Sequence, residues 1–125
     1  MEQGRLPLVL IVDDDRDVVS VLAEVVADEG FRVVTAGSGA EAMHLLRGGL
    51  RPGAVFLDRV MPAPGGEDVL TLMKGDPALS AIPVVWMTGD PRAPPPSVAA
   101  WLRKPFGLAE LLAALNVVRG LGPGG

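Results

Sequence analysis

The chain of 125 residues carries 11 basic and 15 acidic side chains, which gives a formal net charge of −4. This balance disfavours direct contact with nucleic acid or with an anionic membrane, so we predict neither as a partner. The absence of cysteine and the single histidine exclude disulfides, thiolate zinc sites and multi-histidine metal sites, so any metal must take oxygen ligands.

The first apolar run, Leu6 to Val12, is far too short to span a membrane, which makes the cytoplasm the expected location. The 16 glycines and 12 prolines approach the composition of disordered chains, but the 49% of hydrophobic residues indicates a folded core. We therefore expect one domain over residues 1–119, followed by a flexible glycine-rich tail at residues 120–125.

Short apolar runs alternate with segments of helical periodicity along the whole chain. This pattern is typical of βα units around a parallel sheet that is buried on both faces. The strands predicted from it are Leu8–Asp13, Phe31–Thr35, Ala54–Asp58, Val84–Thr88 and Ala100–Arg103. The helices predicted from it are Arg16–Glu29, a segment capped by Ser38 that ends at Gly48, Gly66–Lys74, and a segment from Leu108 that ends before Gly120.

The alternation breaks between the fourth and fifth strands. This segment contains Pro91, Pro94, Pro95 and Pro96. Proline is tolerated only in the first turn of a helix, because it lacks the N–H group and its ring clashes with the preceding turn. The helix expected here is therefore predicted to be truncated to about one turn or missing.

Polar side chains follow the strands, at the edge where parallel α/β sheets bind ligands. The first strand finishes in Asp13-Asp14-Asp15, Asp58 and Thr88 end the third and fourth, and Lys104 follows the fifth. Two carboxylates ~4 Å apart repel by about 4 kcal/mol at an effective dielectric constant near 20, which favours a bound cation, and Mg²⁺ suits an open oxygen site. The Thr88 hydroxyl and the Lys104 ammonium group can bind and stabilise a phosphoryl group. The pattern indicates phosphoryl chemistry on a carboxylate.

Four ordered motifs resemble the receiver domain of two-component response regulators. They are Leu10–Asp15, Val55–Pro62, Val84–Gly89 and Leu102–Phe106. The resemblance covers essentially the whole chain. It implies a doubly wound, flavodoxin-like sheet of five parallel strands in the order 2-1-3-4-5.

The resemblance also implies roles for the acidic residues. Asp58 would accept the phosphoryl group from a sensor histidine kinase or a phosphotransfer protein. Asp14 and Asp58 would bind Mg²⁺ directly, together with the backbone carbonyl of Val60, while Asp13 would act through water. Such a protein promotes only its own phosphorylation and dephosphorylation, so we do not expect an enzyme acting on other substrates.

The remaining roles concern the response to phosphorylation. Thr88 and Lys104 would hold the phosphoryl oxygens, and Trp101 occupies the place of the family's rotameric switch aromatic. The resemblance also suggests a cis bond before Pro105. The altered segment after Thr88 belongs to the face that most receivers use for output and dimerisation, so unusual output is expected.

Other interpretations are open from the sequence alone. The lost helix suggests a receiver-like interaction module whose output does not depend on phosphate. Asp13-Asp14-Asp15 also matches the Asp-x-Asp nucleophile motif of haloacid-dehalogenase-like phosphatases. An EF-hand beginning at Asp13 is disfavoured because its sixth position is Val18 where glycine is needed. The loose dinucleotide pattern at Gly37–Ala42 fits a tight turn into a capped helix better.

Overall fold

The computed structural model of the protein describes residues 7–120. Its five parallel strands form one sheet in the order β2-β1-β3-β4-β5, as predicted. The strands are β1 (Leu8–Val12), β2 (Arg32–Ala36), β3 (Ala54–Asp58), β4 (Val84–Thr88) and β5 (Ala100–Arg103). The order reverses between β1 and β3, because the chain first moves outward to β2 and then returns past β1.

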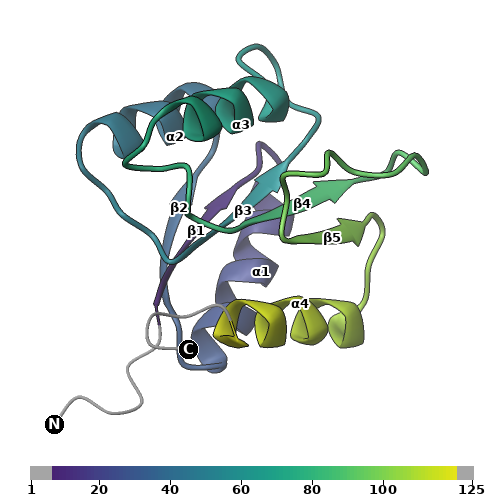
Figure 1. The fold of residues 1–125 in the computed structure, drawn as a ribbon. Coiled ribbons are helices and arrows are strands. Elements are labelled where there is room, and N and C mark those ends of the chain that lie inside the picture. Colours follow the sequence, from purple (N-terminus) through teal and green to yellow (C-terminus); the bar gives the residue numbers. More distant parts are fainter. Residues whose placement is uncertain (1–6, 121–125) are drawn as a thin grey trace, which may run out of the picture.

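Two helices cover each face of the sheet (Figure 1). Helices α1 (Arg16–Asp28) and α4 (Leu108–Gly120) lie on one face, and α2 (Gly39–Arg47) and α3 (Gly66–Gly75) lie on the other. None of these helices, in the part of the chain from residue 7 to residue 120, is long and apolar enough to cross a membrane.

The core consists of two clusters separated by the sheet, because successive strand residues point to opposite faces. Along β4, Val85 and Met87 pack in the cluster beneath α1 and α4. Val84 and Trp86 pack in the cluster beneath α2 and α3. The central strands β3 and β4 are buried along their whole length, which explains why they read as continuous apolar runs in the sequence.

Local signals in the sequence set most helix boundaries. Asp15 caps α1, its side chain accepting hydrogen bonds from the N–H groups of Asp17 and Val18. Gly30 follows α1 with φ of 97°, a conformation that favours glycine. Ser38 caps α2 through the Glu41 N–H group, as predicted.

Several boundaries differ by one residue from the predictions, including the ends of α1 at Asp28, β2 at Ala36 and α3 at Gly75. Strand β2 begins at Arg32, because the Phe31 N–H group bonds back to the carbonyl of Val26. Strand β1 ends at Val12, one residue before the predicted end. The last helix includes Gly120, and the rest of the predicted tail lies outside the described residues.

No helix lies between β4 and β5 in the described chain, which confirms that the helix predicted to be truncated or missing is absent. Residues 89–99 form an irregular connection with a turn at residues 96–97. Its end is fixed by a hydrogen bond of 2.9 Å from the Ala99 N–H group to the Val84 carbonyl. This bond ties the end of the connection to the first residue of β4.

Candidate functional site

The predicted polar residues meet at the carboxyl edge of the sheet. Asp13 follows β1, Asp58 ends β3, Thr88 ends β4, and Lys104 follows β5. Because β1 and β3 are neighbours in register, Asp13 and Asp58 lie beside the point where the strand order reverses. This is the position at which open α/β sheets bind ligands.

Lys104 joins two buried carboxylates. Its Nζ atom lies 2.9 Å from Oδ2 of Asp13 and 3.1 Å from Oδ1 of Asp58. The side chain of Asp13 is 0% exposed and that of Asp58 is 6% exposed. Burial lowers the pKa of Lys104, but the hydrogen bonds and charges of both carboxylates outweigh it, so the pKa is raised overall. The ammonium group therefore stays protonated as the counter-ion of the pair.

Asp13 is fixed in place by the start of α1. Its Oδ1 atom accepts a hydrogen bond of 3.0 Å from the N–H group of Asp15, the residue that caps the helix. Its Oδ2 atom accepts from Lys104. Both carboxylate oxygens of Asp13 are thus already bonded.

The site carries more negative charge than Lys104 neutralises. Burial, followed by the charge of Asp13, raises the pKa of Asp58 from 3.8 to about 6. The charge and hydrogen bond of Lys104 and a hydrogen bond from the Val60 backbone act in the opposite direction. A second cation at this position would favour the ionised form of Asp58.

The donor set fits a hard divalent cation. Asp13, Asp14 and Asp58 each offer a carboxylate oxygen, and these oxygens lie within 4.8 Å of one another. Asp13 and Asp58 are buried while Asp14 is exposed, so the cluster is open to water on one side. Oxygen ligands with an open side suit Mg²⁺, which usually keeps several waters. The part of the backbone carbonyl of Val60 as a further ligand stays a prediction.

The other acidic residues near β1 have different positions. Asp15 caps α1, and Asp17 and Glu24 lie within that helix. They do not form a calcium loop with Asp13, so the EF-hand interpretation is wrong.

Thr88 is buried, with 2% of its surface exposed. Its Oγ1 atom accepts a hydrogen bond of 3.0 Å from the Asp90 N–H group. This bond engages a lone pair of the hydroxyl oxygen and leaves the hydroxyl proton available to donate. The predicted role of Thr88 toward a phosphoryl group needs this proton as a donor.

Trp101 lies on β5 directly opposite Trp86 of β4 and is 37% exposed. Partners in parallel strands point to the same face, so both indoles belong to the face covered by α2 and α3, near the edge where no helix connects β4 and β5. Trp86 is 1% exposed and packs in the core. The switch role of Trp101 stays a prediction. The Lys104–Pro105 bond is cis, as the resemblance implies.

The turn after β3 passes very close to the end of that strand. A Cβ atom on Gly66 would lie 2.3 Å from the carbonyl oxygen of Asp58 and 2.8 Å from Cα of Arg59. Only glycine allows this approach, which brings the first turn of α3 against the end of β3.

One cluster of charged side chains beside the site was missed by the sequence analysis. Arg59 contacts both Glu67 and Asp90, and Asp90 also pairs with Arg92. Arg59 follows Asp58 directly, and Asp90 lies two residues after Thr88. The sequence indicates only that Asp90 and Arg92 are close enough to pair, because one residue separates them. The contacts of Arg59 with Glu67 and Asp90 depend on how the loop folds in three dimensions.

The protein is a doubly wound α/β protein. Three carboxylates and a lysine lie at the point where its strand order reverses. Residues 9–116 match the response regulator receiver domain family, and the chain belongs to this family.

Two mycobacterial relatives show how the chain compares with longer proteins. The DNA-binding response regulator MtrA of Mycobacterium tuberculosis is 36% identical over 80 residues, which cover 64% of this chain and 33% of MtrA. The transcriptional regulatory protein PrrA of the same species is 36% identical over 118 residues, covering 90% of this chain and 49% of PrrA. The chain spans about a third to a half of the length of these relatives.

Solved structures agree with the fold. The chemotaxis response regulator CheY4 of Vibrio cholerae aligns with a TM-score of 0.81 at 24% identity, over 90% of this chain and 98% of CheY4. A CheY-like response regulator receiver domain protein from Methanospirillum hungatei aligns with a TM-score of 0.74 at 30% identity, over 90% of this chain and 97% of that one.

The relatives correct one prediction. The net charge of −4 was expected to rule out nucleic acid as a partner, but MtrA is a DNA-binding response regulator. The exclusion is therefore wrong for a protein of this kind. The physical reason is that the net charge of a receiver domain reports on that domain alone, and the matched region is only a third of MtrA.

Proposed function

We propose that the protein is a phosphoacceptor receiver in which Asp58 takes a phosphoryl group from the phosphohistidine of a sensor kinase or phosphotransfer protein. The observation that carries the proposal is the pairing of Lys104 with Asp13 and Asp58 at the switch point of the sheet. A partly buried lysine between carboxylates is the arrangement needed to neutralise charge on a group transferred to one of them.

The reaction is an in-line displacement at phosphorus. A carboxylate oxygen of Asp58 forms the new O–P bond as the P–N bond of the phosphohistidine breaks, and the bonding electrons leave with the imidazole nitrogen. No general base is required, because Asp58 attacks as a carboxylate. When bound, Mg²⁺ would supply charge neutralisation and align the oxygens of the transferring group.

The remaining residues of the site would bind the phosphoryl oxygens and the metal. Lys104 would pair with a phosphoryl oxygen, and the Thr88 hydroxyl would donate a hydrogen bond to another. Asp13 holds Lys104 at 2.9 Å and is held in turn by the Asp15 N–H group, so the ammonium group is positioned before the donor arrives. Asp13, Asp14 and Asp58 are the residues that would hold the metal.

An apolar groove beside Lys104 fits the phosphodonor. It has a volume of about 540 Å³ and lies between α1 and the turn after β5. Val18 and Val21 of α1 line one side, and Pro105 and Phe106 line the other. Because Lys104 itself borders the groove, a donor helix seated there would bring its phosphohistidine to Asp58.

The test is an intact-mass measurement after incubation with Mg²⁺ and acetyl phosphate as a small phosphodonor. We expect one added phosphoryl group, lost in Asp58→Asn and kept in Asp28→Asn, an exposed carboxylate on α1. No mass shift, or a shift that survives Asp58→Asn, would reject the proposal. Sustained hydrolysis of a phosphomonoester that depends on Asp13 would instead favour the phosphatase interpretation.

The missing helix between β4 and β5 favours a second candidate, a receiver-like module whose partner binding does not depend on phosphate. Partner binding by the parent and by Asp58→Asn, with and without phosphodonor, distinguishes the two candidates. Partner binding that is unchanged by Asp58→Asn and by phosphodonor supports the second, and binding that strengthens on phosphorylation supports the first.

A further inference from the structure

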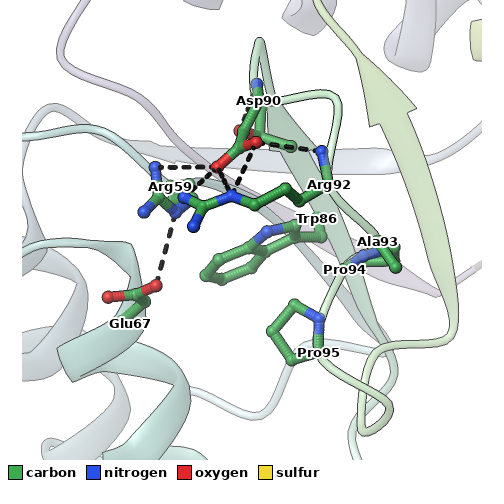
Figure 2. Close-up of a pocket in the computed structure, with 9 residues that line it drawn as sticks. Arg59, Glu67, Trp86, Asp90, Arg92, Ala93, Pro94 and Pro95 are labelled. Atoms are coloured by element: carbon green, nitrogen blue, oxygen red, sulfur yellow. Dashed lines mark hydrogen bonds and ion pairs between the residues drawn. The ribbon is translucent and has the colours of Figure 1, made fainter.

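The connection between β4 and β5 closes over a cavity of about 350 Å³ (Figure 2). Trp86 and Thr88 of β4 line it from the sheet, and Pro94 and Pro95 line it from the connection. Arg59 and Glu67 border it from the side of β3 and α3. The cavity is therefore bounded by the segment that replaces the missing helix.

A cluster of charged side chains joins the two sides of this cavity. The Asp90 carboxylate accepts hydrogen bonds from the Arg92 backbone at 2.9 Å and from Nε of Arg92 at 2.9 and 3.0 Å. Its Oδ2 atom, which Arg92 also contacts, lies 3.8 Å from Nη1 of Arg59. Figure 2 shows contacts from the Asp90 carboxylate to both Arg59 and Arg92, with the Trp86 indole beside Arg92.

The cluster continues to α3. Nε of Arg59 lies 3.3 Å from Oε2 of Glu67, a residue in the first turn of that helix. Arg59 thus connects α3 with the proline-rich connection through Glu67 on one side and Asp90 on the other. We call these four residues, Arg59, Glu67, Asp90 and Arg92, the latch.

Few other bonds hold the connection. Its prolines at positions 91, 94, 95 and 96 have no N–H group to donate. Apart from the latch, the described backbone bonds at its far end run from Val98 to Pro95 and from Ala99 to Val84. Within the latch, the Arg59–Asp90 pair at 3.8 Å is the contact that ties residues 89–95 to the segment after β3, and the hydrogen bond from the Asp90 N–H group ties them to Thr88.

The latch is also connected to the proposed phosphorylation site. The N–H group of Asp90 donates to the Thr88 hydroxyl at 3.0 Å, and Arg59 follows Asp58 in the chain. If the Thr88 hydroxyl shifts toward a phosphoryl group on Asp58, this hydrogen bond must stretch or move Asp90. If Asp90 moves, the carboxylate shared by Arg59 and Arg92 moves with it.

We propose that the latch holds the connection closed over Trp86 while Asp58 is unphosphorylated, and that phosphorylation releases it. The connection then takes the place of the missing helix as the element that changes on activation. The inference rests on the proposed function for its trigger, but the closing role of the latch can be tested in the unphosphorylated protein alone.

The experiment measures how well Trp86 is shielded. In a Trp101→Phe background Trp86 is the single tryptophan, so quenching of its fluorescence by acrylamide reports on this cavity. We compare the background protein with Asp90→Ala, which removes the latch carboxylate but keeps the backbone N–H group. Asp28→Ala on α1 is the matched control.

Without phosphodonor, we expect the quenching constant to rise two- to threefold in Asp90→Ala and to stay unchanged in Asp28→Ala. With Mg²⁺ and acetyl phosphate, the background protein should reach the value of Asp90→Ala, and Asp90→Ala should change no further. Equal quenching of Asp90→Ala and Asp28→Ala would overturn the latch.

Intact mass, measured on the same samples, separates the two proposals. A phosphoryl group on Asp58 with unchanged quenching overturns the release step and leaves the proposed function standing. No phosphoryl group in any sample overturns the proposed function, and with it the trigger, while the comparison without phosphodonor still decides the closing role.

Trypsin gives a second readout in case a variant folds poorly. The Arg92–Ala93 bond is intact in Asp90→Ala, and trypsin needs the Arg92 side chain free of its partner. We expect cleavage there to be several-fold faster in Asp90→Ala than in Asp28→Ala, with unchanged far-UV circular dichroism. Equal cleavage rates would contradict the latch.

Discussion

Lys104 reaches across β4 to contact Asp58: its Nζ atom lies 3.1 Å from Oδ1 of an aspartate two strands away in the sheet. The same ammonium group contacts Asp13, so three strands contribute to one ionic centre. Neither carboxylate has another basic side chain within ion-pair distance among residues 7–120. The properties of the site therefore depend strongly on Lys104.

Lys104→Met should weaken both the fold and the reaction. It leaves two buried carboxylates without their cation, so we expect the free energy of unfolding at pH 7 to fall by about 1–3 kcal/mol. Phosphorylation by acetyl phosphate should slow by tenfold or more, because the charge on the transferring group is no longer neutralised. Urea unfolding and intact-mass time courses measure the two effects, with Arg47→Met on α2 as control. A normal phosphorylation rate would contradict the assigned role.

The stability of the Mg²⁺-free protein should depend on the ionisation of Asp58. Burial and the charge of Asp13 raise its pKa from 3.8 to about 6 on folding, so the folded state binds more protons between these values. Its stabilising contribution is full below about pH 4 and is lost as the pH rises through 6. Asp58→Asn should therefore be more stable than the parent at pH 7, by about 2–3 kcal/mol, and this gain should shrink toward pH 4.

Urea unfolding across this pH range, without Mg²⁺, provides the measurement. Asp28→Asn serves as the comparison at every pH. A stability gain at pH 7 no larger in Asp58→Asn than in Asp28→Asn would show that the Asp58 carboxylate is not under electrostatic strain.

Mg²⁺ should stabilise the parent through the three clustered carboxylates. At a concentration ten times its Kd, a ligand that binds only the folded state adds about 1.4 kcal/mol. Asp14→Asn should lose most of this gain while keeping the contacts of Lys104, because Asp14 is the exposed member of the cluster. Thermal unfolding with and without Mg²⁺ tests this. Equal stabilisation of Asp14→Asn and the parent would place the ion elsewhere.

Gly66→Ala should be strongly unfavourable, whereas Gly75→Ala in the same helix should not. The added Cβ atom at position 66 would lie 2.3 Å from the Asp58 carbonyl oxygen, and the one at position 75 meets nothing within 4 Å. We expect a loss of about 1–3 kcal/mol for Gly66→Ala. For Gly75→Ala we expect a gain of up to about 1 kcal/mol. Chemical denaturation of both variants checks the pair, and similar losses would argue against the tight turn.

Val21→Lys should slow phosphotransfer from a kinase but not phosphorylation by acetyl phosphate. Val21 is 61% exposed on α1 and lines the groove beside Lys104. Phosphotransfer from a kinase should slow tenfold or more, because a charge would enter an apolar contact, while the reaction with acetyl phosphate should be unchanged. Val117→Lys, at a 41% exposed position on α4, is the control. If both variants accept kinase phosphate at the parent rate, the donor does not dock in this groove.

The sheet and the meeting of its polar residues could be predicted because both follow from local patterns. Buried parallel strands read as apolar runs, and residues at their carboxyl ends share one edge of the sheet. Asp13, Asp58, Thr88 and Lys104 are therefore neighbours in space although they are distant in sequence. The absence of a helix between β4 and β5 could also be predicted, since four prolines in one connection cannot be accommodated in a helix interior.

The latch could not be predicted in the same way. Arg59, Glu67 and Asp90 meet because an irregular connection happens to pass α3, and no periodicity determines that path. The exclusion of nucleic acid failed for another reason, because net charge is a property of the segment counted and not of the assembly in which a receiver acts.

Strand β5, which ends just before Lys104, has four residues and a single neighbour in the sheet, and the connection before it supplies few bonds. Native proteins open in cooperative segments, and the most weakly attached segment opens first. The ionic centre thus depends on the edge of the sheet that is easiest to detach, while the packed strands β1 and β3 can stay intact. Loss of phosphoacceptor competence on heating would accordingly be a local, reversible opening that precedes collapse of the hydrophobic core.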